Sequence, residues 1–297
     1  MLIADFFWGW KNDRKKYHWS SWKNLRYPYE EGGIGMRNLQ DVCKSFQFKH
    51  WWSFRTKQTL WGDFLRAKYC QRANPVNKKW DTGQSLMWKN MLDTRQQMEQ
   101  HIHWKLQAGN CSFWWDNWLG TGPLAQHTGS SNRFNNSSVA DFWENGEWKW
   151  SKLVRHAPIT HLSSILATRI PQQQHRPDQA IWKLNIHGRF DCKSAWDEIR
   201  NKKAKNFFNS ALWHKFIPFK TSFLLWRTLK GKLPTNEKLS NFGIEPLPCF
   251  YCFDRAGMDT IEHIFNSGPF ATIVWNFFAA TAGIQADHST LPALIKQ

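Results

Sequence analysis

The chain has 297 residues, with 40 Lys and Arg against 23 Asp and Glu, a formal net charge of +17 and a pI near 9.8. This length predicts two domains, or one large domain with appendages. The charge excess favours an anionic partner, nucleic acid first, although a merely basic soluble protein has the same composition. The 21 Trp and 22 Phe exclude a disordered chain, and most of these rings are expected in the core.

The cysteines and the N-terminus bear on the compartment. Only Cys249 and Cys252 of the six cysteines are close together, which does not resemble a disulfide framework and favours a reducing compartment. The N-terminus lacks the features of a signal peptide. No apolar run approaches the roughly 18 residues that span a bilayer. We therefore expect a nuclear or cytoplasmic protein with no membrane partner.

Residues 1–95 are predicted to be mainly helical. Asn38 is a suitable N-cap for a helix in which apolar residues recur at helical spacing, namely Leu39, Val42, Cys43 and Phe46. A second helix over 60–69 carries two apolar faces, one with Leu60 and Phe64 and the other with Trp61 and Leu65.

The middle of the chain predicts short β elements rich in Trp. Residues 104–120 suggest a turn followed by a strand that points Phe113 and Trp115 to one side. Residues 145–150 read as a further extended piece. Residues 180–192 predict a hairpin that turns at His187 and Gly188.

The last third is predicted to be helical again. A helix follows residue 192, and another is expected after Ser210. Pro218 and Gly231 bound a segment with one aromatic face, formed by Phe219, Phe223 and Trp226. Thr235 can cap the next helix, and a final helix is expected from Pro269 to Gly283.

Positive charge is concentrated in one part of the chain. Residues 193–238 hold eleven Lys or Arg and three acids, a net charge of +8, whereas residues from 245 onward hold five acids and two bases. Aromatic residues lie among these cations, as on surfaces that contact phosphates and stack bases. The alternative is a solvated helix face over an aromatic core. The candidate phosphate contacts are Lys202, Lys203, Lys205, Lys215, Lys220, Arg227, Lys230 and Lys232.

A Cys-x-x-Cys pair with a later histidine suggests a metal site. Cys249, Cys252 and His263 offer two thiolates and an imidazole, the ligands that zinc prefers. A fourth ligand is not evident. Water or a carboxylate, from Asp254, Asp259 or Glu262, could complete the tetrahedron. The alternative is an ordinary cysteine pair beside a histidine on a helix face.

Other catalytic patterns are missing from the sequence. It has no adjacent Asp pair of the polymerase kind, no G-x-S-x-G, no Walker loop and no H-E-x-x-H. His101 and His103 share a strand face but have no third metal ligand, so they are interpreted as surface or hydrogen-bonded residues.

Several segments together resemble one known family. LWHKFIPFKTSFLLWRTLKGKLPTNEKLSNFGI, CFYC and TIEHIFNSGPFATIVW resemble the zinc-binding domain at the C-terminal end of plant LINE-type (non-LTR) retrotransposon reverse transcriptases. FFWGW, HWSSWKNLRYP, EEGGIGMRNL, LWGDFLRAKY, SFWWDNWLGTGPL and GRFDCKSAWDEIR resemble, in order, the segments that link that family's polymerase to this domain. The likeness covers nearly the whole chain.

The resemblance implies a ligand set and a deviation from it. The family pattern is Cys-x-x-Cys followed by His-hydrophobic-Phe-x-x-Cys-Pro. Aligning His263 and Pro269 carries over Cys249 and Cys252, and sets Gly268 where the last cysteine belongs. Glycine has no side chain to bind metal, so zinc is expected to be held weakly or lost, with the aromatic core maintaining the fold.

The sequence therefore predicts a mainly helical α+β protein with Trp-rich β elements in the middle and a helical C-terminal zinc-binding-like domain. Its expected regions are a helical linker after an absent polymerase (1–95), a Trp-rich α+β region (96–188), the zinc-binding-like domain (189–285) and a tail (286–297). The resemblance implies a non-catalytic, retrotransposon-derived fragment that binds RNA or DNA beside a polymerase portion. The alternatives are a structural or protein-interaction module that binds neither nucleic acid nor zinc, and an enzyme with its own activity.

Overall fold

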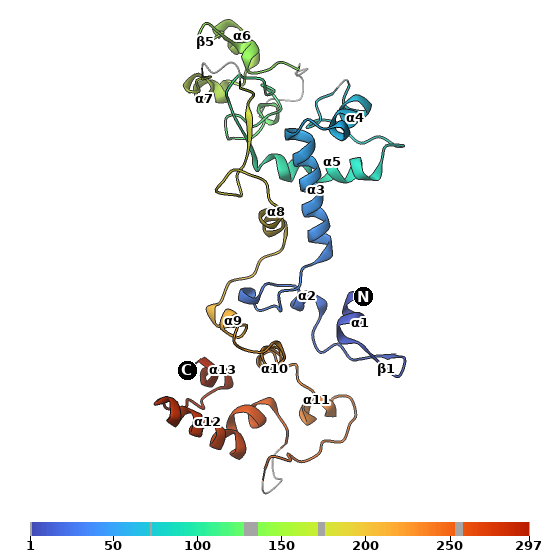
Figure 1. Cartoon of the computed structure of the whole chain (residues 1–297), viewed down its shortest axis with the longest axis vertical. Helices are drawn as coiled ribbons and strands as arrows, with labels where there is room; N and C mark the ends of the chain where they lie inside the picture. Colours follow the sequence, from blue (N-terminus) through green and yellow to red (C-terminus); the bar gives the residue numbers. More distant parts are fainter. Residues whose placement is uncertain (1, 72, 128–135, 172–175, 253–257, 297) are drawn as a thin grey trace. The chain divides into compact units, whose positions relative to one another are not determined.

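The computed structural model describes residues 2–71, 73–127, 136–171, 176–252 and 258–296 (Figure 1). The chain folds into two compact units, one formed by residues 39–200 and the other by residues 1–38 together with 201–297. Helices dominate, and the strands of the described residues form two-stranded antiparallel pairs. The expected mainly helical α+β class is thus confirmed. None of the helices in these residues combines the length and apolar content needed to cross a bilayer.

The unit formed by residues 39–200 contains helices of three turns or more, several shorter helical turns and two strand pairs. Its elements are α3 (Leu39–Thr56), α4 (Leu60–Tyr69), α5 (Leu86–Glu99), β3 (Ile102–Lys105), η2 (Leu124–Gln126), η3 (Ala140–Phe142), β4 (Trp143–Glu144), β5 (Glu147–Trp148), α6 (Trp150–His156), η4 (Ile159–His161), α7 (Leu162–Ala167), β6 (Gln179–Trp182) and α8 (Cys192–Ile199). In Figure 1, α5 crosses α3, and α4 lies beside the end of α3.

Large aromatic side chains decide which face of α3 is buried. Both predicted helices form over the expected residues, but the buried positions of α3 are Ser45, Phe48, Trp51 and Phe54. Leu39 and Phe46 of the predicted apolar face are about half exposed. Trp51 and Phe54 instead pack with Trp88 of α5 and Trp182 of β6 in one core cluster. Burying Trp51 and Phe54 outweighs burying Leu39, Val42 and Cys43, because burial stabilises roughly in proportion to area. Phe46 is as large as Phe54 but is not among the buried positions of the helix.

The expected strand after residue 110 is wrong. Phe113, Trp114 and Trp118 are all buried, whereas a strand would send Phe113 and Trp114 to opposite faces. The backbone here forms turns, with a single bridge from Ser112 to Ser138. The side chain of Asp178 accepts backbone hydrogen bonds from Gln107, Gly109 and Cys111 at 2.6–2.9 Å, which replaces a strand ladder.

Residues 180–192 do not form the expected hairpin of two paired strands, because the strand at its start pairs with a different segment. Strand β6 pairs antiparallel with β3, with Ile102 opposite Trp182, rather than with the residues that follow it. The turn itself forms where expected, because Trp182 N donates to Gly188 O over 2.9 Å and Gly188 has a φ of 67°. The expected extended piece near residue 148 is confirmed as β5, which pairs with β4.

The second unit joins the N-terminal segment to the last third of the chain. Its elements are α1 (Leu2–Trp8), β1 (Trp10–Lys11), β2 (Arg14–Lys15), α2 (Trp22–Leu25), η1 (Tyr29–Glu31), α9 (Phe207–Ala211), α10 (Phe219–Leu229), α11 (Asn236–Ser240), η5 (His263–Ser267), α12 (Pro269–Ala282) and α13 (Leu291–Lys296). Leu25, Ile34 and Trp226 form its small core, covered by half-buried rings such as Phe7 and Phe223. The expected functional regions with borders at 95, 188 and 285 stay a prediction.

Most helix boundaries predicted for this unit are confirmed. Helix α10 follows Pro218, its rings at 219, 223 and 226 stack in succession, and α12 runs from Pro269 to the left-handed Gly283. One boundary is wrong, because helix α9 begins before Ser210, where Asn206 caps it by accepting from the backbone N–H of Phe208. Thr235 is the N-cap residue of α11 as predicted, but its side chain makes no capping hydrogen bond. The short hairpin of β1 and β2 interrupts the described residues of 1–95, which are otherwise mainly helical as expected.

Candidate metal centre

The two cysteines of the candidate site lie on a tight loop. Cys252 N donates to Cys249 O over 3.5 Å, which closes the Cys-x-x-Cys turn. An antiparallel bridge between Pro248 and Met258 brings the two arms of this loop together. Both cysteines are buried. The loop thus presents two sulfur atoms at one corner, as a zinc site requires.

His263 reaches the cysteines from the first position of η5, a single π-helical turn. Thr260 Oγ1 accepts from His263 N over 3.0 Å and fixes the start of this turn. His263 Nε2 lies 2.8 Å from Cys252 Sγ, and the ligand atoms of Cys249, Cys252 and His263 all lie within 4.8 Å of one another. Ligand atoms around a tetrahedral zinc are about 3.5–3.8 Å apart, given Zn–S and Zn–N bonds of about 2.3 and 2.0 Å. The three ligand atoms are close enough to share one zinc ion, for which Nε2 and the Cys252 sulfur would have to separate from 2.8 Å to about 3.5 Å.

The surroundings of Cys249 bear on its charge. Burial, and then the neighbouring Asp259 carboxylate, raise the pKa of the Cys249 thiol to about 11. Zinc binds thiolates and favours their deprotonation strongly. A bound zinc ion would supply the positive charge that a buried thiolate needs here, and it would crosslink the loop to η5.

Gly268 is held closely against the histidine turn. Gly268 N donates to His263 O over 2.8 Å, which closes the π-helical turn. A Cβ atom at residue 268 would lie 2.3 Å from the carbonyl oxygen of His263 and 3.3 Å from its Cε1. A side chain at this position would start beside the histidine ring, but the backbone leaves no room for its first carbon. The turn as folded requires glycine.

The candidate phosphate contacts all belong to the same unit, but they differ in exposure. Lys215 and Lys220 are exposed, Lys203 Nζ lies 3.9 Å from the Tyr27 ring, and Lys205 Nζ pairs with Glu30 at 2.8 Å. Lys202 and Lys230 are exposed and Lys232 is half-buried. Arg227 is also half-buried. Its Nε donates to Lys232 O over 3.0 Å, and burial lowers its pKa.

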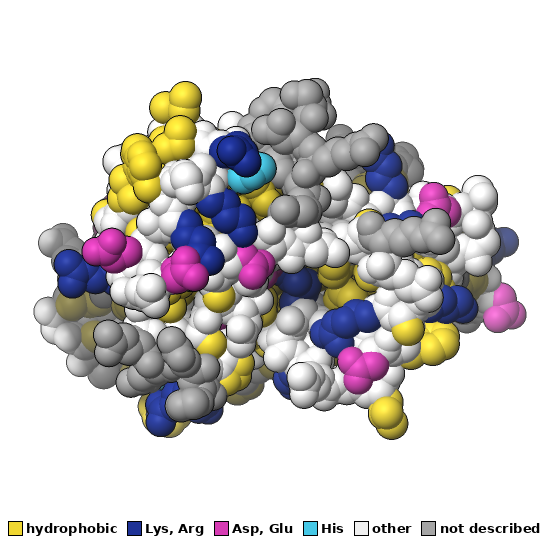
Figure 2. Space-filling model, turned by 90° about the horizontal axis from the view of Figure 1, so that it is seen from above, with side chains coloured by type: hydrophobic (Ala, Val, Ile, Leu, Met, Phe, Trp, Pro, Cys, Tyr) yellow, Lys and Arg dark blue, Asp and Glu magenta, His cyan; other side chains and the backbone are white. Residues whose placement is uncertain are grey.

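Exposed aromatic rings lie among these lysines in the sequence. Phe207, Phe216 and Phe219 are 88%, 80% and 55% exposed. The sequence predicted aromatic rings among these cations, as on surfaces that stack bases, but did not single out these three residues. Their alternation with cations in HKFIPFK was the available signal. Figure 2 views the molecule from above, where α4, α6 and α7 lie in Figure 1, and on this face Lys and Arg side chains are interspersed with acidic and uncharged ones.

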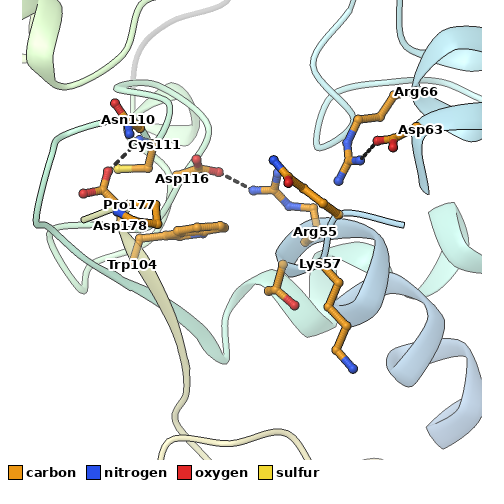
Figure 3. A pocket seen from close by; sticks show the side chains of 12 residues that line it. Arg55, Lys57, Asp63, Arg66, Trp104, Asn110, Cys111, Asp116, Pro177 and Asp178 are labelled. Atoms are coloured by element: carbon orange, nitrogen blue, oxygen red, sulfur yellow. Dashed lines mark hydrogen bonds and ion pairs between the residues drawn. The ribbon is translucent and has the colours of Figure 1, made fainter. Parts of the chain in front are cut away.

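A polar hollow of about 700 Å³ lies in the unit formed by residues 39–200. Figure 3 shows Arg55 extending toward Asp116 across it, with the Trp104 ring nearby and Arg66 paired to Asp63. Arg55 also donates to Glu99 over 2.8 Å. The guanidinium groups of this hollow are therefore occupied by carboxylates of the same chain, which argues against an anion site.

Neither His101 nor His103 belongs to a group of candidate metal ligands among the described residues. His103 lies on β3, and His101 directly precedes it and faces Glu198 at 3.5 Å. Their interpretation as hydrogen-bonded or surface residues accords with His101, whereas His103 Nδ1 is buried with no hydrogen-bond partner in the described part of the chain.

Comparisons with known proteins address the origin of this site. Residues 190–275 match the family described as zinc-binding in reverse transcriptase, and this range contains all three candidate ligands. The expectation of a reverse transcriptase zinc-binding domain is thereby confirmed. The family that matches is a zinc-binding region and not a polymerase.

A longer relative covers most of the chain. A protein of Arabidopsis thaliana named "Putative ribonuclease H protein" is 23% identical over 289 residues, which cover 92% of this chain. The chain spans 46% of that relative's length. No solved structure matches. These similarities fit a chain related to reverse transcriptase proteins.

Proposed function

We propose that this chain is a retroelement-derived, nucleic-acid-binding accessory region of a plant LINE-type reverse transcriptase, without polymerase or ribonuclease H chemistry of its own. The observation that carries the proposal is the stretch from residue 202 to 220, in which exposed lysines alternate with exposed phenylalanines. Lysines attract the phosphate backbone, and exposed rings offer stacking surfaces to unpaired bases. An RNA or DNA single strand held here would serve a polymerase portion elsewhere.

The proposed surface is best represented by Lys215 and Lys220 with the neighbouring rings of Phe216 and Phe219. Lys215 Nζ lies 5.0 Å from the centre of the Phe216 ring, so a nucleotide could contact the positive charge and the ring at the same time. Phe219 lies 5.6 Å from Trp213, which in turn stacks on Tyr29 at 4.8 Å. These contacts support one side of each ring and leave the rings substantially exposed, as a base-stacking platform requires.

A salt series with single-stranded RNA tests this proposal. Each phosphate contact contributes a slope of about −0.7 to log K against log salt. Replacing Lys215, Lys220 and Lys230 with glutamine is expected to reduce the slope by up to about 2. The matched control replaces Lys44, Lys49 and Lys57 of the other unit, which removes the same charge. An equal loss in both triple variants, or a flat salt response of the parent, contradicts the proposal.

The second candidate is a protein-interaction module that binds no nucleic acid. The observation in its favour is the apolar surface of α12, where Phe270, Ile273, Phe277 and Phe278 are each more than half exposed. Exposed apolar patches mark interaction sites more often than chance. Under this alternative the lysine variants bind RNA as weakly as the parent. Charged residues introduced on α12 would instead weaken association with a protein partner.

A further inference from the structure

Asp259 follows Met258, whose bridge to Pro248 brings this segment alongside the cysteine loop. Its carboxylate is not part of the group of ligand atoms that lie within 4.8 Å of one another, so it would have to turn toward them when zinc binds. Because Gly268 has no side chain, Cys249, Cys252 and His263 leave one tetrahedral position without a protein ligand. We propose that Asp259 fills that position and that the site binds zinc as a closed Cys₂-His-Asp centre.

The two carboxylate oxygens of Asp259 have different environments. Oδ2 accepts from Asn236 Nδ2 over 2.9 Å, and this contact fixes the side chain. Oδ1 is buried and has no hydrogen-bond partner among the described residues. A buried carboxylate oxygen without a partner is costly, so such an atom calls for a donor or a cation. A zinc ion held by the three neighbouring ligands supplies that cation.

The remaining side chains near the site are poorer candidates. Glu262 is exposed, and its Oε1 accepts from Asn266. Residue 268 cannot carry a side chain while the π-helical turn is closed. Asp254, weighed from the sequence, lies outside the described residues. Asp259 therefore combines proximity with an uncommitted oxygen.

A carboxylate is chemically suited to this position. Asp binds zinc through oxygen at about 2.0–2.2 Å, and it carries the same formal charge as a thiolate. The site would thus hold two thiolates, one imidazole and one carboxylate. Asn236, at the start of α11, would orient the aspartate by its hydrogen bond, as partners of metal ligands commonly do. The centre would link α11, the cysteine loop and η5.

The test uses the full chain loaded with Zn²⁺ or Co²⁺. Zinc affinity is measured by chelator competition for the parent and for Asp259→Asn, with Asp254→Asn and Glu262→Gln as matched controls. Asparagine at 259 can still bond Asn236, so the loop geometry is retained. Asp259→Asn is expected to weaken zinc binding at least about tenfold, while both controls bind like the parent.

A second measurement asks whether the metal has an open position. The visible spectrum of the Co²⁺-loaded parent should not change when imidazole is added, whereas Asp259→Asn should take up imidazole and change its spectrum. The imidazole response of the parent protein is informative even if the Asp259→Asn variant does not fold. The proposal fails if the parent binds no metal, if the parent itself takes up imidazole, if Asp259→Asn binds zinc like the parent, or if either control shows the loss instead. None of these outcomes depends on RNA binding, so the proposed function is tested separately.

Discussion

Trp226 donates a hydrogen bond from Nε1 to the carbonyl oxygen of Gly32 over 2.9 Å and so joins residues 194 positions apart. Trp226 is buried on α10, and Gly32 follows the turn η1 in the N-terminal segment. The bond ties the two sequence pieces of one compact unit together. The C-terminal helices are therefore completed by the N-terminal segment.

Trp226→Phe is expected to destabilise this unit by about 1–3 kcal/mol, because the Gly32 carbonyl loses its partner while most of the ring packing is kept. Amide hydrogen exchange of residues in η1 and α10 measures the effect locally. Trp148→Phe is the matched control, since it removes an equivalent bond from Nε1 to Thr168 O, 2.8 Å long, in the other unit. Faster exchange in η1 and α10 only for the control would contradict this role.

Arg55 neutralises two buried carboxylates, Glu99 and Asp116. Arg55→Met leaves both acids in the interior without their cation, which is expected to cost about 3–5 kcal/mol. Urea unfolding followed by tryptophan fluorescence measures this loss. Asp63→Asn breaks the exposed pair with Arg66 and should cost less than about 1 kcal/mol. Similar losses for the two variants would show that the buried network is not stabilising.

The stability of residues 39–200 is expected to fall in mild acid. Burial lowers the pKa of both His101 and His103, so the folded unit binds fewer protons than the unfolded chain. The contribution is complete above the unfolded pKa of about 6.5 and is lost as the pH falls through the lower folded values.

Unfolding free energies at pH 7.5, 6.5 and 5.5 measure this dependence. The double variant His101→Gln, His103→Gln should reduce the slope below pH 6.5. His187→Gln, at an exposed residue of the same unit, should leave the slope unchanged. An undiminished slope in the double variant would assign the pH dependence to other groups.

Gly268→Ala is expected to destabilise the π-helical turn by about 1–3 kcal/mol, because the new Cβ meets the His263 carbonyl. Hydrogen exchange of residues 263–268 measures the opening. Gly268→Cys carries the same steric cost, so any gain in zinc affinity has to be compared with Gly268→Ala and not with the parent. An alanine variant as protected as the parent would mean that the turn relaxes freely.

Chelation of zinc is expected to leave most of the fold in place. The core around Trp226 and the clusters of the other unit contain none of the candidate ligands. Far-UV circular dichroism should change little with EDTA, while hydrogen exchange should increase between residues 247 and 268. Loss of helix throughout the chain on chelation would show that the metal, and not the aromatic core, maintains the fold.

The metal ligands were the part of the site most open to sequence reasoning. A Cys-x-x-Cys pair is local, so its spacing alone indicates a corner with two sulfurs, and His263 follows close behind. The choice between Asp254, Asp259 and Glu262 was not open to such reasoning. Our proposal of Asp259 rests on its hydrogen bond from Asn236 and on the bridge between Pro248 and Met258, which are contacts between separate segments of the chain.

Local signals in the sequence were sufficient for the helical class and for the bounds of α4 and α12, and they indicated Cys249, Cys252 and His263 as candidate ligands, which the structure brings together. Proline, glycine and apolar period act within a few residues, so they can be recognised without the rest of the chain. Only the tertiary structure decided that Trp51 and Phe54 of α3 face the core of their unit and that β6 pairs with β3. It also decided that the Gly32 carbonyl accepts a hydrogen bond from Trp226. These outcomes depend on how large rings from distant segments pack together in the interior. The hydrophobic pattern of a single segment does not show which distant rings it will pack against.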